Sequence, residues 1–227
     1  MRLVIRVREK VFMFWLSILE AHSNISLKGD GEDVPGVKLD KARAASIVAM
    51  SAALYAVFFF LSSLVGVPSF VVLYLPIILL GVFPIWFGRS GLVGSMIGAF
   101  IGGFYVESLG YFAWIESVTT LIIYSLNWIL IPQRAVKAEA KKYLLLLLSV
   151  YAVTLFVGTV FVLWQLTLVG FLPAGVAEVL LLPTFGLNFA IEAIICPILI
   201  RTVSPRLRSW GIYYGNFWEW RRRRVSS

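Results

Sequence analysis

Long apolar segments alternate with short polar or glycine-rich segments along most of the chain. An apolar helix of about 20 residues is long enough to cross the hydrocarbon core of a bilayer. The pattern therefore predicts an all-α fold, a polytopic membrane protein with six transmembrane helices. The expected spans cover residues 44–66, 70–87, 91–107, 111–131, 143–169 and 176–200.

Small residues recur at every fourth position in the third predicted span, residues 91–107. Gly94, Gly98 and Gly102 form this repeat, and Ser95 begins a second one a residue later. Small side chains allow neighbouring membrane helices to approach closely. We therefore predict that these glycines mediate helix packing and that the third span is the central helix of the bundle.

The second predicted span, residues 70–87, contains Pro76 and Pro84. Proline lacks the backbone N–H that a helix interior needs, and its ring clashes with the preceding turn. We therefore expect the second span to be kinked.

An alanine repeat marks the first predicted span, where Ala45, Ala49 and Ala53 are spaced by four. Such a repeat places small side chains on one face of a helix. Two interpretations are open: ordinary packing within the bundle, or a smooth face on which another membrane subunit docks.

Composition and charge support the membrane class and indicate an orientation. Hydrophobic residues make up 60% of the chain, charged residues only 14%, and the mean hydropathy is +0.89. With six spans, all 20 Lys and Arg residues fall on one side. The positive-inside rule then predicts that both termini are cytoplasmic and that the protein is a multi-pass protein of the plasma membrane. This placement explains the net charge of +8 without nucleic-acid binding.

Enzyme signatures are absent from the sequence. It contains no Walker loop, no zinc-protease motif and no nucleophile elbow, and it has one cysteine and one histidine. We predict that the protein is not an enzyme and that it has no metal site and no cofactor.

The two ends of the chain differ in composition from the six-span domain, residues 42–201. Residues 1–41 read as an interfacial amphipathic helix followed by a flexible cytoplasmic linker, with a secretory signal as the alternative. Residues 202–227 form a basic, aromatic cytoplasmic tail. This tail either lies on an anionic leaflet or is a disordered flank.

Polar residues form stripes on the last three predicted spans. An acid inside a membrane costs roughly 2.5–3.5 kcal/mol on insertion scales, so it needs a partner or a use. We interpret the stripes as the walls of a small-molecule pocket in the outer half of the membrane. Its expected residues are Glu116, Thr120, Asn127, Gln165, Asn188 and Glu178, with Trp114 and Trp164 at its edges. Structural hydrogen bonds between helices are the alternative for Asn127 and Gln165, and Glu192 could pair with a cytoplasmic arginine.

Three segments resemble the substrate-binding S component of energy-coupling factor (ECF) vitamin transporters. They are KARAASIVAMSAALYAV, LPIILLGVFPIWFGRSGLVGSMIGAFIGG and ESVTTLIIYSLNWILIP, and the resemblance covers residues 42–200. It implies a vitamin-binding membrane subunit that docks on a transmembrane coupling subunit driven by two ATPase subunits. It also implies that Ala45, Ala49 and Ala53 form the docking face and that Trp114 and Glu116 lie in the substrate zone.

The sequence departs from this family at three places. The amino-terminal extension of about 40 residues is long, and the loop after the first span, which would serve as a lid, is short. The histidine-bearing amino terminus of nickel and cobalt members is missing, which argues against a metal substrate.

The acids near the outer side favour a neutral or cationic, nitrogen-rich ligand, such as a thiamine-like vitamin or vitamin precursor. Two other functions stay open. One is a proton- or cation-coupled secondary transporter that uses Glu116 and Glu192, although no inverted repeat is visible in the sequence. The other is a scaffold subunit of a membrane assembly that transports nothing.

Overall fold

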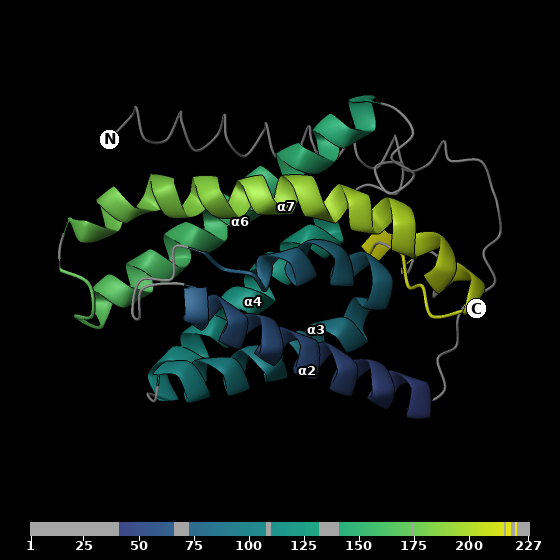
Figure 1. Ribbon diagram of the computed structural model, residues 1–227, viewed down its shortest axis with the longest axis horizontal. Helices are drawn as coiled ribbons and strands as arrows, with labels where there is room; N and C mark the ends of the chain where they lie inside the picture. The colour runs from purple at the N-terminus through teal and green to yellow at the C-terminus, as the bar shows by residue number, and fades with distance from the viewer. Residues whose placement is uncertain are drawn as a thin grey trace. The chain divides into compact units, whose positions relative to one another are not determined.

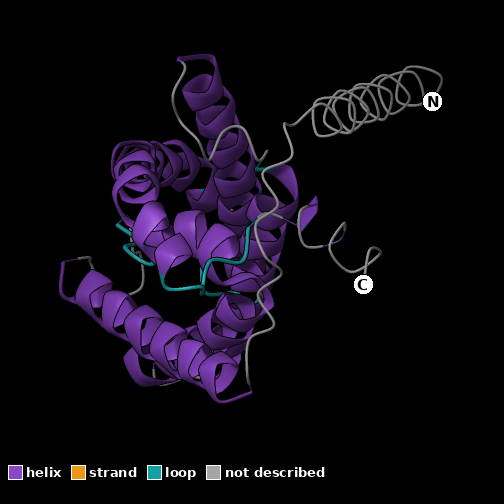
Figure 2. Ribbon diagram, turned by 90° about the vertical axis from the view of Figure 1, so that its right-hand side faces the viewer, coloured by secondary structure: helices purple, strands orange, loops and turns teal. Residues whose placement is uncertain are grey.

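The computed structural model describes residues 41–65, 73–107, 110–131, 141–173, 175–215, 217–218 and 221. Within these residues the structure contains five long α-helices (Figure 1). They are α2 (Lys41–Val65), α3 (Ile77–Glu107), α4 (Gly110–Leu130), α6 (Lys141–Leu168) and α7 (Val176–Ser209). Each is long and apolar enough to cross a membrane, and Figure 2 shows no strand among the described residues. The all-α prediction is confirmed for the described residues, and their five long apolar helices indicate a multi-pass membrane protein. The predicted segment 1–41 lies almost entirely outside the described residues.

The expected second and third spans form a single element, α3, which is interrupted at Gly88. Gly88 has φ 49° and ψ −126°, a conformation that interrupts the helix and that glycine adopts most readily. The first half of α3, residues 77–87, rises only about 16 Å, roughly half of a bilayer core. The described residues thus contain five long apolar helices, one of which consists of two helical segments that meet at Gly88.

Pro76 lies immediately before the first helical residue and causes no kink. At the start of a helix the missing N–H of proline has no partner to lose, and its fixed φ suits the first turn. The carbonyl of Pro76 accepts hydrogen bonds from the N–H groups of Leu79 and Leu80. Helix α3 thus begins later than the expected boundary at residue 70.

The first half of α3, which we call the buried half-helix (residues 77–87), is the centre of the fold. All its large side chains are at most 6% exposed, and Ile77, Leu80, Val82 and Ile85 are completely buried. The glycine-rich half of α3 is peripheral instead, since Ile97 and Phe104 on its outer side are 43% and 55% exposed. The expectation that residues 91–107 form the central helix is therefore wrong. An interrupted helix leaves backbone groups unpaired, and these are tolerated at membrane depth only inside protein.

The glycine repeat of α3 packs directly against α2. A Cβ atom added to Gly98 would lie 2.5 Å from the carbonyl oxygen of Ala52 and 2.7 Å from Cβ of Tyr55. Gly102 lies against the ring of Phe59, and Gly94 lies against Val48, Ser51 and Ala52. Only glycine allows the two helices to approach this closely. The alanines Ala45, Ala49 and Ala53 are exposed on α2.

The chain folds back after α7, which continues to Ser209 beyond the expected end near residue 200. The N–H groups of Tyr214 and Gly215 donate to the carbonyls of Trp86 and Ile85, both at 2.9 Å. Because the helix is interrupted at Gly88, these carbonyls end the buried half-helix and need other donors. The described part of the predicted tail, residues 202–227, therefore includes a cap for this helix. Residues 216, 219, 220 and 222–227 lie outside the described part, so contact with a leaflet stays a prediction.

Candidate functional site

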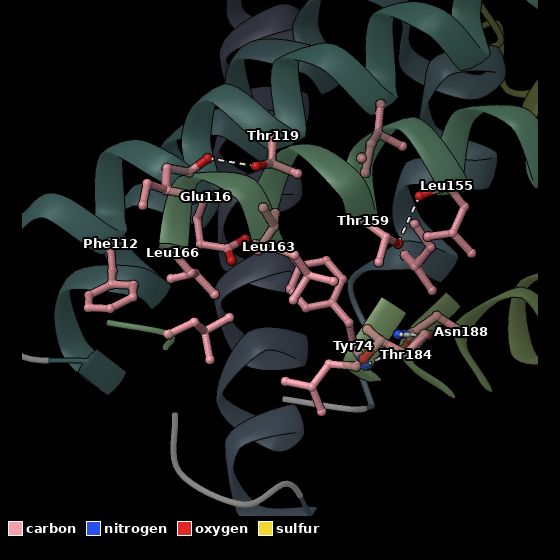
Figure 3. A pocket seen from close by; sticks show the side chains of 17 residues that line it. Tyr74, Phe112, Glu116, Thr119, Leu155, Thr159, Leu163, Leu166, Thr184 and Asn188 are labelled. Atoms are coloured by element: carbon pink, nitrogen blue, oxygen red, sulfur yellow. Dashed lines mark hydrogen bonds between the residues drawn. The ribbon is translucent and has the colours of Figure 1, made fainter. Parts of the chain in front are cut away.

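A cavity of about 110 Å³ lies between α4, α6 and α7, beside the segment that precedes α3 (Figure 3). Its walls are mostly apolar, with side chains such as Phe112, Ile123, Leu155 and Leu163. The polar groups that line it are Tyr74, Glu116, Thr119, Thr159, Thr184 and Asn188. Among the described lining residues, Glu116 is the only carboxylic acid, and there is no Lys, Arg or His. The cavity therefore favours a neutral or cationic group next to Glu116.

Glu116 is the end point of a chain of hydroxyl groups. The hydroxyl of Tyr74 donates to Oε2 of Glu116 at 2.9 Å, and Figure 3 shows the two side chains close together. Tyr74 also bonds the hydroxyl of Tyr55, which bonds Oγ1 of Thr120 at 2.6 Å. Each hydroxyl has a single hydrogen. Since Tyr74 donates its own to Glu116, Tyr55 must donate to Tyr74, and Thr120 must donate to Tyr55.

This direction of donation has a consequence for the cavity. Every hydrogen in the chain points toward Glu116, and hydrogen bonds in series polarise and strengthen one another. Glu116 is thus held as an acceptor at one oxygen and fixed in position on the cavity wall. The chain also connects α2, through the fully buried Tyr55, to the acid on α4.

Asn188 on α7 positions Tyr74 through the backbone of the tyrosine. The backbone N–H of Tyr74 donates to Oδ1 of Asn188 at 2.7 Å, and Nδ2 of Asn188 donates to the carbonyl of Thr184 at 2.8 Å. The adjacent N–H of Leu75 donates to Oγ of Ser62 on α2 at 2.8 Å. The segment before α3 is thereby tied to α2 and α7. Because the hydroxyl of Tyr74 also bonds Glu116 on α4, three helices hold the tyrosine at the cavity.

Comparison with known proteins adds nothing to this geometry. No family model, curated protein or solved structure matches the chain. Within the described residues there is no group of three or more His, Cys, Asp or Glu that could hold a metal ion. The function must therefore be argued from the site itself.

Two of the eight residues expected at the pocket, Glu116 and Asn188, line the cavity. Trp114 and Trp164 are 65% and 55% exposed, and the ring of Trp114 packs against Phe100 of α3. Glu178 is exposed in the first turn of α7. The remaining three make other contacts: Thr120 bonds Tyr55, Gln165 accepts a long bond of 3.4 Å from Tyr111, and Asn127 lies deeper in the bundle.

Asn127 compensates for the proline in the buried half-helix. The carbonyl of Leu80 would normally accept the N–H of residue 84, but Pro84 has none. Nδ2 of Asn127 donates to this carbonyl at 3.0 Å, and Oδ1 of Asn127 accepts from Thr154 at 2.8 Å. The described hydrogen bonds of Asn127 thus match the structural alternative.

We expect the Asn127→Leu substitution to destabilise the fold by about 1–3 kcal/mol, because it leaves the buried carbonyl of Leu80 without this donor and leaves Thr154 only its longer bond to the carbonyl of Tyr151. The substitution Pro84→Ala restores an N–H for Leu80, so Asn127→Leu should cost less in that background. Thermal unfolding of the four proteins in detergent measures this coupling. Equal costs in both backgrounds would show that Asn127 does not replace the missing donor.

The sequence interpretation missed Tyr74, Thr119, Thr159 and Thr184 at the cavity. A usable signal existed for Tyr74, because Pro76 is typical of a helix start and places Tyr74 before the helix. The threonines gave no such signal. Thr119 and Thr159 bond carbonyls of their own helices, so threonine is compatible with an apolar wall.

Proposed function

We propose that the protein is the membrane-embedded substrate-capture subunit of an ECF-type importer, and that it binds a vitamin or vitamin precursor. The observation that carries the proposal is the Glu116–Tyr74 pair, which is fixed on the wall of a mostly apolar cavity between membrane helices. Ligand sites of this kind combine apolar walls with a few placed polar groups.

The cavity supports a definite class of ligand. A cavity of about 150 Å³ is known to hold benzene, so the volume of about 110 Å³ found here suits a ring of that order. The ring should carry nitrogen and be neutral or cationic, because Glu116 accepts hydrogen bonds or faces positive charge. One ring of a thiamine-like compound satisfies these conditions. A ligand of more than one ring would need α7 or α6 to move outward.

The proposal includes partners and an orientation. Both termini would be cytoplasmic in the plasma membrane, as the distribution of Lys and Arg favours. The exposed alanine face of α2 would dock on a transmembrane coupling subunit driven by ATPase subunits. Tyr55 lies on the buried face of the same helix and bonds the hydroxyl of Tyr74. Docking on α2 would therefore be transmitted directly to the group that holds Glu116.

Ligand retention tests the proposed function. We expect the protein purified in mild detergent to retain a small nitrogen-containing ring compound, which mass spectrometry of the extract would identify. Binding of a vitamin panel, measured by calorimetry, would then give the affinity. An empty protein that binds no member of the panel would contradict the proposal and favour a scaffold role. Gradient-driven uptake by the protein alone in liposomes would favour a secondary transporter instead.

A further inference from the structure

A second acid, Glu192, is buried away from the cavity. It lies near the middle of α7, and its side chain has no exposed surface. Neither carboxyl oxygen has a hydrogen-bond partner within the described residues. A Cβ atom added to Gly81 would lie 3.0 Å from Oε1 of Glu192, so the carboxyl group packs against the bare backbone of the buried half-helix.

Among the residues that the structure describes, no positively charged group acts on Glu192. The buried half-helix, IILLGVFPIWF, contains no titratable side chain. The titratable neighbours are Tyr151 on α6 and Cys196 on α7. Both side chains bond the backbone of the half-helix. The hydroxyl of Tyr151 donates to the carbonyl of Gly81 at 3.1 Å, and Sγ of Cys196 contacts the carbonyl of Ile78 at 3.5 Å.

These contacts limit what the carboxyl group can bind. A metal cation would need several oxygen ligands and the space to seat them. The carboxyl instead lies against Gly81, and Sγ of Cys196 packs against the same glycine, since a Cβ there would come within 3.0 Å of Oε1 and 2.6 Å of Sγ. A bare carboxylate at this depth would lack both water and a counter-charge, which is costly in a membrane. A proton neutralises the group and requires no space.

We propose that Glu192 is a proton-binding site in the membrane core. Its carboxyl group holds a proton while α7 packs on the buried half-helix. When the two helices separate and water enters, the O–H bond breaks, the proton passes to water and the carboxylate remains. Protonation is thereby linked to the contact between α7 and the half-helix. This inference does not depend on the identity of any ligand.

The position of Glu192 extends this link to the cavity. Asn188 lies one turn earlier on α7 and accepts the N–H of Tyr74. Separation of α7 from the half-helix would disturb this bond, and with it the tyrosine that donates to Glu116. Loss of the proton from Glu192 would therefore accompany opening of the cavity wall formed by α7.

Infrared spectroscopy tests the proton directly. The full-length protein in detergent at neutral pH should show the carbonyl band of a protonated carboxylic acid. An exposed glutamate, with a pKa of about 4.3, is ionised there and lacks this band. The band should disappear in Glu192→Gln and persist in Glu116→Gln. If Glu192→Gln fails to fold, the spectrum of Glu116→Gln, which retains Glu192, decides the matter. Absence of a protonated carboxyl band in Glu116→Gln at neutral pH would overturn the proposal.

Stability against pH gives a second test. Glu192 holds its proton in the fold and loses it in the unfolded chain above about pH 5, so unfolding releases one proton. The folding equilibrium constant of the wild type should therefore fall roughly tenfold per pH unit relative to Glu192→Gln as the pH rises. Identical pH dependence of the two proteins would mean that Glu192 is already ionised in the fold, and would refute the site.

Discussion

Replacing Glu116 by glutamine should weaken ligand binding by roughly one to two orders of magnitude while leaving the fold intact. The expected loss is about 1.5–3 kcal/mol, the range for a hydrogen bond to a charged group. Glutamine keeps an oxygen that accepts the hydroxyl of Tyr74, so the chain through Tyr55 and Thr120 can persist. Titration of the retained ligand by calorimetry measures the affinity, and thermal unfolding measures the stability.

Two variants serve as controls for Glu116→Gln. Glu178→Gln makes the same chemical change at an exposed position in the first turn of α7, and it should cost much less affinity. Tyr74→Phe keeps the ring at the cavity but removes the hydroxyl that donates to Glu116, so its effect should be intermediate. If Glu116→Gln unfolds the protein while the remaining folded fraction binds normally, Glu116 is structural and the ligand site lies elsewhere.

The substitutions Ala49→Trp and Ala53→Trp should abolish copurification with a coupling subunit while ligand binding survives. Both alanines are exposed on α2, so in the isolated protein an indole at either position would extend into lipid without displacing a neighbouring helix. A docked membrane helix approaches closely only over small side chains, and a tryptophan would hold it away. Affinity purification of the coexpressed complex, followed by ligand titration of the free subunit, measures both outcomes.

A matched control for the alanine variants is Leu182→Trp on α7. Leu182 is 73% exposed, so this change adds the same side chain to a different outward face. It should leave assembly unchanged. Normal assembly of Ala49→Trp and Ala53→Trp would show that the alanine face is covered only by lipid. Loss of assembly in Leu182→Trp as well would point to a general effect of added tryptophan.

Much of the molecule could be predicted from local pattern. Apolar length and the spacing of small residues depend only on residues near one another in the chain, so they indicated membrane helices and a close packing of Gly94, Gly98 and Gly102. The structure places these glycines against α2. The cost of an acid in a membrane is likewise independent of the fold, and it directed attention to Glu116, which lines the cavity.

Other features depended on contacts between distant parts of the chain. Hydropathy treats lipid and protein surroundings alike, so it could not show that residues 77–87 form a buried half-helix in place of a lipid-facing span. The role of Asn127 required the knowledge that Pro84 deprives Leu80 of its donor and that the two helices meet at that level.

Helical periodicity also left the orientation of each helix undetermined. It groups residues on a face, but only packing decides which neighbour that face meets. For this reason Trp114 and Trp164 turned out to be exposed, while Tyr74, which lies outside any helix, became the donor to Glu116. The same limit applies to Glu192, whose carboxyl group packs against Gly81 and has no hydrogen-bond partner within the described part of the chain. Local pattern thus determined which segments form long apolar helices and which acid lines the cavity, whereas packing between helices decided the partners of the acids.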